Sequence, residues 1–149
     1  MKIRQGFVSN SSSSSFIISS KYDKDIVLQY AKEQARYAAI ERFIADAKYI
    51  LKDKDNHYGT WEERQLYVLK KLVYLGDRYD DPRLCSIDIT TVGELKNEEC
   101  PPFCIDEWYS NLKDTDLVLF DYSDNFIPEE ACEKIIKKFK CENYNTHMG

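Results

Sequence analysis

The chain has 149 residues, of which 43% are apolar and 32% charged, and its net charge is −5. This length and balance are typical of one ordinary globular domain over residues 1–149, and they exclude an intrinsically disordered chain. Basic residues alternate with acidic ones and are not massed on one face, so we expect no general nucleic-acid binding.

No stretch approaches the roughly 18 apolar residues that a membrane-spanning helix needs, and no apolar run of signal-peptide length follows the start. We therefore expect a cytoplasmic protein with no membrane association. The five cysteines are an odd number in a chain without an export signal, which favours free thiols.

The first element, residues 2–18, contains an unbroken serine run. Residues that favour strands lie on both sides of it, Phe7 and Val8 before it and Phe16 to Ile18 after it. This pattern predicts either a hairpin or a strand–loop–strand segment.

Residues 23–53 lack proline and glycine and repeat apolar residues at spacings of three and four, which predicts one long helix. Its inward face comprises Tyr37, Ile40, Ile44, Ala47 and Leu51. A second helix is expected from Thr60, because Thr60 and Glu63 spell a capping box, and Gly76 is a fitting stop. Its predicted buried stripe comprises Leu66, Leu69, Leu72 and Val73. The two helices are expected to form an antiparallel hairpin.

In the last third of the chain, alternation over Cys85–Thr91 predicts a half-buried strand, and the apolar run Leu117–Phe120 predicts a fully buried one. The two prolines within residues 100–104 predict irregular backbone there, followed by a short helix over 106–112. A last helix is expected from Pro128 to about Lys140. The predicted fold is α+β, with a small, mostly antiparallel sheet of about three or four strands, covered by a long helical hairpin and a C-terminal helix.

The serine run is the first candidate site. Hydroxyls and backbone amides together bind phosphate oxygens, and a nearby arginine supplies positive charge. The candidate anion ligands are Arg4, Asn10, Ser11, Ser12, Ser13 and Ser14. The glycines and the lysine of a Walker loop are missing, and the alternative is a polar connection between two strands.

The segment Lys2–Phe16, which reads KIRQGFVSNSSSSSF, resembles the opening of a group of uncharacterised small proteins of tailed bacteriophages and related mobile elements. The resemblance covers about a tenth of the chain. It implies a phage or prophage accessory protein acting in a bacterial cytoplasm, and it supplies no catalytic residue. Proteins of such size and origin often bind and redirect a host protein, which is an argument by association.

Metal sites are the next candidates. Four residues could hold a structural zinc ion if the C-terminus folds back: Cys100, Cys104, Cys141 and His147. The spacing is unusual for zinc, which prefers two close cysteine pairs. Asp121, at the end of the predicted buried strand, is the most interesting carboxylate for a Mg²⁺-dependent reaction, although aspartates beside strands are usually turn residues.

No catalytic residue is identified and no cofactor is expected, so an enzyme is the less favoured class. The leading hypothesis is a phage accessory protein that binds a host or phage protein, inhibiting or diverting host machinery. One alternative is a phosphate- or nucleotide-binding domain that uses the serine loop. A second alternative is a structural component of the virion.

Overall fold

The structure is a computed structural model, and it describes residues 7–8, 14–97, 104–105, 112–121 and 127–145. The chain divides into two compact units. The first, called the sheet unit here, comprises Met1–Ala35 and Ser86–Gly149, and the second, called the hairpin unit, comprises Arg36–Cys85. Each unit is described by itself.

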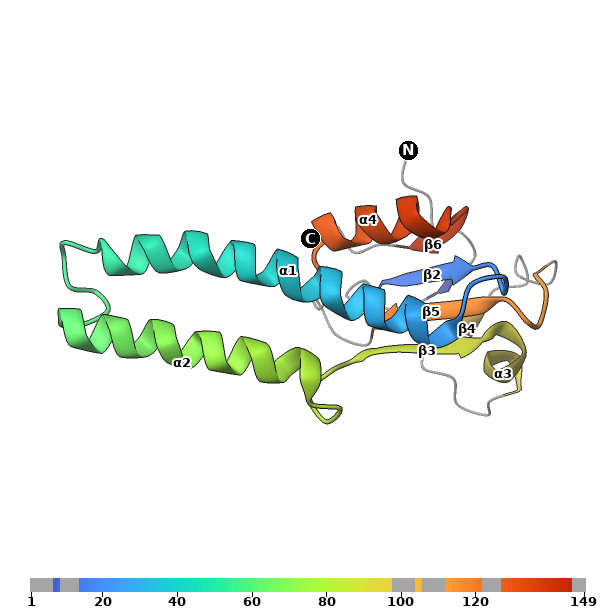
Figure 1. Ribbon diagram of the computed structural model, residues 1–149, viewed down its shortest axis with the longest axis horizontal. Helices are drawn as coiled ribbons and strands as arrows, with labels where there is room; N and C mark the ends of the chain where they lie inside the picture. Colours follow the sequence, from blue (N-terminus) through green and yellow to red (C-terminus); the bar gives the residue numbers. More distant parts are fainter. Residues whose placement is uncertain (1–6, 9–13, 98–103, 106–111, 122–126, 146–149) are drawn as a thin grey trace. The chain divides into compact units, whose positions relative to one another are not determined.

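The sheet unit is built on a four-stranded antiparallel sheet with the order β3-β5-β2-β6 (Figure 1). These strands are Ile87–Thr91, Leu117–Asp121, Ser15–Ile18 and Asn143–Asn145. The central pair aligns Ile17 with Val118. Because β2 has a neighbour on each side, it cannot also pair with β1 (Phe7–Val8), which pairs with β4 (Cys104–Ile105). The N-terminal segment is therefore no hairpin, and its two strands belong to different sheets.

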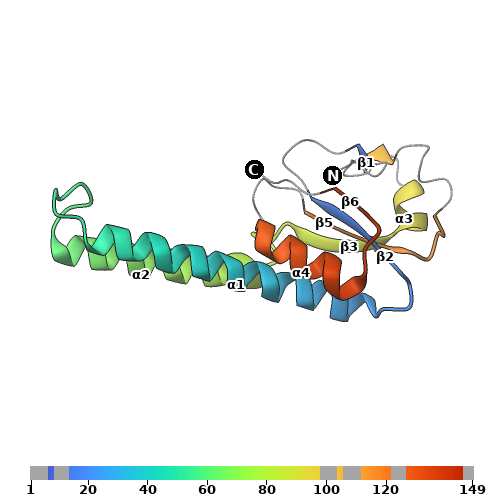
Figure 2. The same ribbon diagram turned by 90° about the horizontal axis from the view of Figure 1, so that it is seen from above.

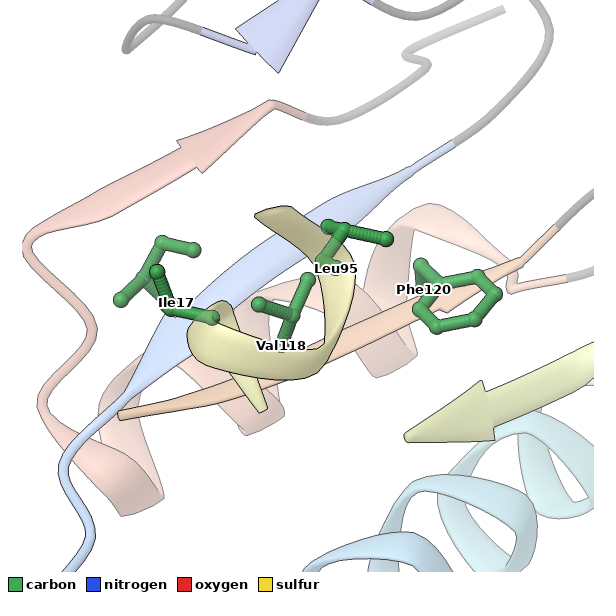
Figure 3. Close-up of a cluster of buried hydrophobic side chains, with 5 residues drawn as sticks. Ile17, Leu95, Val118 and Phe120 are labelled. Atoms are coloured by element: carbon green, nitrogen blue, oxygen red, sulfur yellow. The ribbon is translucent and has the colours of Figure 1, made fainter. Parts of the chain in front are cut away.

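One face of the sheet is covered by a short helix, α3 (Val92–Lys96). Its Val92 and Leu95 form a buried cluster with Ile17, Val118 and Phe120 (Figure 3). Thr91 caps this helix by accepting a hydrogen bond from the Glu94 N–H at 3.1 Å. A threonine three residues before a glutamate is the local sequence signal of this helix.

The other face is covered by α4 (Glu129–Phe139) and by the first part of α1 (Lys24–Leu51), as Figure 2 shows. Phe16 and Ile18 lie on this face, because successive side chains of a strand point to opposite sides. The Phe139 ring meets the rings of Tyr22 and Tyr30 edge-on, with centroids 5.0 Å and 5.4 Å away. With both faces covered, every residue of β2 and β5 is buried.

The hairpin unit consists of the second part of α1 and of α2 (Trp61–Asp80), which run antiparallel (Figure 1). The predicted capping box is present, since Thr60 and Glu63 bond each other's backbone N–H groups, both at 3.3 Å. At the loop end, Arg64 Nη1 donates to the carbonyl of Leu51 at 2.8 Å. At the other end, Arg36 forms an ion pair with Asp80. These contacts fix which parts of α1 and α2 lie side by side.

The predicted α+β class, the antiparallel sheet, the two long helices and the C-terminal helix are confirmed. The predicted stop at Gly76 is wrong, because α2 continues to Asp80. Gly76 has no positive φ, and the additional turn buries Tyr79. The predicted short helix over 106–112 falls almost wholly outside the described residues.

The predicted buried stripe of α2 is also wrong. All four of its members are exposed: Leu66, Leu69, Leu72 and Val73. On α1, Tyr37 and Ile44 are likewise exposed, whereas Ala47 and Ile50 are buried. The physical reason is that two helices meet along a single seam, so a second apolar stripe on either helix has no neighbour within the hairpin.

Candidate functional site

The predicted anion site is described at its last residue alone. Outside the described residues lie Arg4, Asn10, Ser11, Ser12 and Ser13. Ser14 is buried just before β2, and its backbone N–H donates to Oδ2 of Asp121 at 3.0 Å. In return, the Asp121 N–H donates to the Ser14 carbonyl at 3.1 Å. The end of the serine run is thus fixed to the end of β5.

This pair of contacts works against an anion at Ser14. The backbone N–H that would bind a phosphate oxygen already serves a carboxylate. That carboxylate is 1% exposed, and its charge would repel a second anion strongly at short range in this poorly hydrated position. Anion binding by the rest of the serine run stays a prediction. The described geometry gives Oδ2 of Asp121 a structural contact, and a metal-ligand role for this carboxylate stays a prediction.

Cys132 lies beside this pair, on the buried face of α4. Burial raises the pKa of its thiol to about 12; a hydrogen bond with Ser14 lowers this pKa, and the charge of Asp121 raises it. The thiol also lies 3.6 Å from the carbonyl oxygen of Ile127, to which it donates. A thiol that stays protonated at neutral pH is a poor nucleophile. The Ser14–Asp121–Cys132 cluster therefore holds structure together and offers no activated group.

The four candidate zinc ligands are described only in part. Cys100 and His147 lie outside the described residues, and only the backbone of Cys104 is described, in β4. The Cys141 thiol is buried 3.9 Å from the Ile135 carbonyl oxygen, and burial raises its pKa to about 12. Zinc binds the thiolate, so Cys141 would have to lose its proton to become a ligand. The zinc site stays a prediction.

The loop of the hairpin gathers Asp53, Asp55 and His57 within reach of one another. The Asp53 carboxylate accepts backbone N–H groups of Asp55 at 3.1 Å and Tyr58 at 3.3 Å, and it contacts His57 Nδ1 at 3.3 Å. Burial acts to raise the pKa of Asp53, but these hydrogen bonds outweigh it and lower the pKa. The carboxylate closes the loop, as aspartates in turns commonly do.

The sheet unit also carries an open depression of about 380 Å³. Two lysines and two acidic residues contribute to its lining, namely Lys21, Lys140, Asp116 and Glu142. Because these charges balance, the depression favours neither an anion nor a cation.

One side of the hairpin carries exposed tyrosines. Tyr67 and Tyr74 lie two turns apart on α2, and the Tyr58 ring packs 5.8 Å from the Tyr67 ring. Lys71 Nζ lies 5.2 Å from the centre of the Tyr67 ring. We call Tyr58, Tyr67 and Tyr74 the tyrosine face. Each of these side chains combines a large apolar ring with a hydroxyl that can form hydrogen bonds with a partner.

A second exposed surface lies on the opposite side of the hairpin seam. Successive residues of a helix turn by about 100°, which separates Leu66, Leu69 and Val73 from the tyrosines of the same helix. We call the following set the apolar face: Tyr37, Ile44, Leu66, Leu69, Leu72 and Val73. Each side chain of this set is at least 43% exposed, although six large apolar side chains on one helical surface are typical of a buried interface.

Among the residues that the structure describes, no helix has the length and apolar character needed to cross a membrane. Comparison with protein-family models, curated proteins and solved structures found no match to this chain. Its function therefore has to be argued from its own surfaces.

Proposed function

We propose that this chain is a non-enzymatic accessory protein of a phage or prophage that binds a host protein in the bacterial cytoplasm, inhibiting or diverting it. The tyrosine face is the proposed binding surface. The origin rests on the resemblance of Lys2–Phe16 to the phage group, and the binding role rests on the exposed aromatic residues of the hairpin.

The single observation that carries the proposal is the exposure of Tyr58, Tyr67 and Tyr74 along one side of the hairpin. They are 41%, 39% and 56% exposed. Tyrosine is enriched at the centres of protein–protein interfaces, because its rigid ring buries much area at little conformational cost. Lys71 beside Tyr67 adds a positive charge that complements an acidic partner surface.

The chemistry of the sheet unit supports a binding role over catalysis. The two buried thiols, Cys132 and Cys141, have raised pKa values, and Asp121 is engaged by Ser14. An active site needs titratable groups that converge on an accessible pocket. In the described part of this unit, these two thiols and this carboxylate lie inside the core.

The test is quantitative affinity capture from a bacterial lysate. A tagged Tyr67→Ala/Tyr74→Ala variant is compared with the unsubstituted protein. Truncating two central aromatic anchors typically costs several kcal/mol of binding free energy, so we expect the specific partner to be lost almost entirely.

The matched control is Tyr49→Ala. Tyr49 is the most exposed tyrosine of the hairpin at 74%, but it lies on α1, outside the tyrosine face. We expect this variant to retrieve the partner as well as the unsubstituted protein does. Retrieval of the same proteins by all three forms, or of none above background by any, would contradict the proposal.

A further inference from the structure

The apolar face has no function in the proposed partner binding, because it lies on the side of the hairpin seam opposite the tyrosine face. From the surface geometry we infer that it binds a second copy of this chain, so that two hairpins pack face to face as an antiparallel four-helix assembly.

Both helices of the hairpin contribute to one continuous apolar surface. Tyr37 and Ile44 are seven residues apart on α1, and Leu66 and Val73 are seven apart on α2. Each pair therefore forms a stripe along its helix. On each helix, the stripe is reached from the seam by turning about the helix axis in the direction in which the chain winds from N- to C-terminus. Because the two helices run antiparallel, this turn places both stripes on the same side of the helix pair.

The apolar face also has a large exposed area. With about 150–200 Å² as the full surface of one such side chain, the exposed fractions of the six residues of the apolar face amount to roughly 600 Å². A standard interface covers about 800 Å² on each partner, and in homodimers about 65% of it is apolar. The apolar face therefore has the apolar area that one half of a homodimer interface requires.

The apolar face can pair with itself about a two-fold axis. The Arg64–Leu51 contact places these two residues at the same height along the paired helices. Seven residues further from the loop, Ile44 of α1 and Lys71 of α2 are therefore also at the same height. A two-fold axis that crosses the hairpin at this level, at right angles to the helices, places each copy antiparallel to the other. On α2 it sets Leu69 opposite Val73 of the second copy.

The same axis accounts for Gly76. It sets Leu66 of one copy opposite Gly76 of the other. A Cβ built on Gly76 meets no atom within 4 Å, so the hairpin alone gives no reason for a glycine here. Glycine inside a helix costs about 1 kcal/mol relative to alanine. A leucine from a second copy that fills this space explains why the cost is tolerated.

Residues of opposite charge border the apolar face on α1. Glu41 and Lys48 are exposed on α1, flank Ile44 in sequence, and lie on the side of the helix that borders the apolar face. Antiparallel packing about Ile44 sets Glu41 of one copy opposite Lys48 of the other, and the contact occurs twice by symmetry. Opposite charges at the rim favour this register and orientation.

The experiment is sedimentation equilibrium of the full chain at concentrations up to about 100 μM, a range that detects any dimer of moderate affinity. We expect the unsubstituted protein to be a dimer. Leu69→Glu is expected to raise the dissociation constant at least ~100-fold, because it buries a carboxylate at the centre of the interface. The matched control, Tyr74→Glu, introduces the same charge on the opposite side of the hairpin, and we expect it to dimerise normally.

A charge exchange tests the orientation. Lys48→Glu sets two acidic residues opposite each other twice and is expected to weaken the dimer about 10-fold, and Glu41→Lys/Lys48→Glu is expected to restore it. Lys54→Glu, in the loop, makes the same charge change away from the face and should have no effect. A monomer at every concentration, a higher oligomer, or an unchanged mass for Leu69→Glu overturns the proposal, and so does a charge exchange that fails to restore association. Capture of a host protein by either face leaves these masses unaffected, so the two proposals fail separately.

Discussion

The two units of the chain treat similar apolar residues in different ways. In the sheet unit, every residue of β5 is buried, and Leu119 is fully enclosed. In the hairpin unit, α2 buries Tyr79 alone, and Leu69 is 58% exposed. A sheet with helices on both faces closes its own core, whereas two helices share only one seam. The sheet unit therefore holds its core within itself, while the hairpin has apolar surface available for a partner.

The same substitution in each unit should give the largest contrast. Leu119→Ala removes a side chain with no exposure from the centre of the sheet, so we expect a loss of about 2–5 kcal/mol in the free energy of unfolding. Leu69→Ala in dilute, monomeric protein should change that free energy by less than about 0.5 kcal/mol. Urea unfolding followed by circular dichroism measures both. Equal losses would mean that the comparison between the units is wrong.

Chemical labelling of a buried thiol tests whether the core of the sheet unit is closed. Because the pKa of Cys132 is raised from 9.0 to about 12, its thiolate fraction at neutral pH is about a thousandfold below that of an ordinary thiol. We expect iodoacetamide to label Cys132 only after unfolding, and peptide mass spectrometry measures this. Rapid labelling of the native protein would show that α4 opens.

The sign of the pH dependence follows from the same shift. Below pH 9 the Cys132 thiol is protonated in the folded and unfolded states, and the stability that it contributes is fully present. As the pH rises toward about 12, the unfolded state loses its proton first, so this contribution declines. Cys132→Ala should make the alkaline decline of the unfolding free energy shallower.

A smaller effect is expected from the contact that fixes the serine run. Asp121→Ala removes the carboxylate that accepts the Ser14 N–H, and we expect a loss of about 1.5–3 kcal/mol. Asp114→Ala is the matched control, since Asp114 is exposed and pairs with Lys96, and it should cost at most ~1 kcal/mol. Hydrogen exchange at the Ser14 amide reports the contact directly. An amide that stays protected in Asp121→Ala would contradict the assigned role.

The sequence predicts elements best where one local pattern decides the outcome. The capping box at Thr60 needs only Glu63 three residues later, and it is present. The continuous apolar run at Leu117 predicts a strand covered on both faces, and β5 is such a strand. Cys132, Ile135 and Phe139 recur at helical spacings in the last helix, a local pattern that indicates an inward face, and all three are buried.

The sequence predicts poorly where distant residues decide. An apolar stripe on α2 indicates burial but does not name the surface that buries it, so Leu66 and Val73 are exposed in the isolated chain. The contact between Ser14 and Asp121 spans 107 positions and leaves no local pattern. Strand β6 was missed for a related reason, because its Asn-Tyr-Asn sequence has low strand propensity and is held by pairing with β2.

The smallest predicted effect is that of Gly76→Ala, which should differ between the monomer and the proposed dimer. Gly76→Ala adds a methyl group where no atom lies within 4 Å, and alanine favours helix, so the dilute monomer should gain up to about 1 kcal/mol of stability. In the dimer the same methyl group meets Leu66 of the second copy, and association should weaken. Thermal unfolding at low and at high protein concentration measures the stability of the monomer and of the dimer, respectively. If Gly76→Ala is more stable than the unsubstituted protein at every concentration, a second copy does not explain the glycine. If the substitution stabilises the dilute protein but destabilises the concentrated protein, Gly76 lies in an interface between two copies.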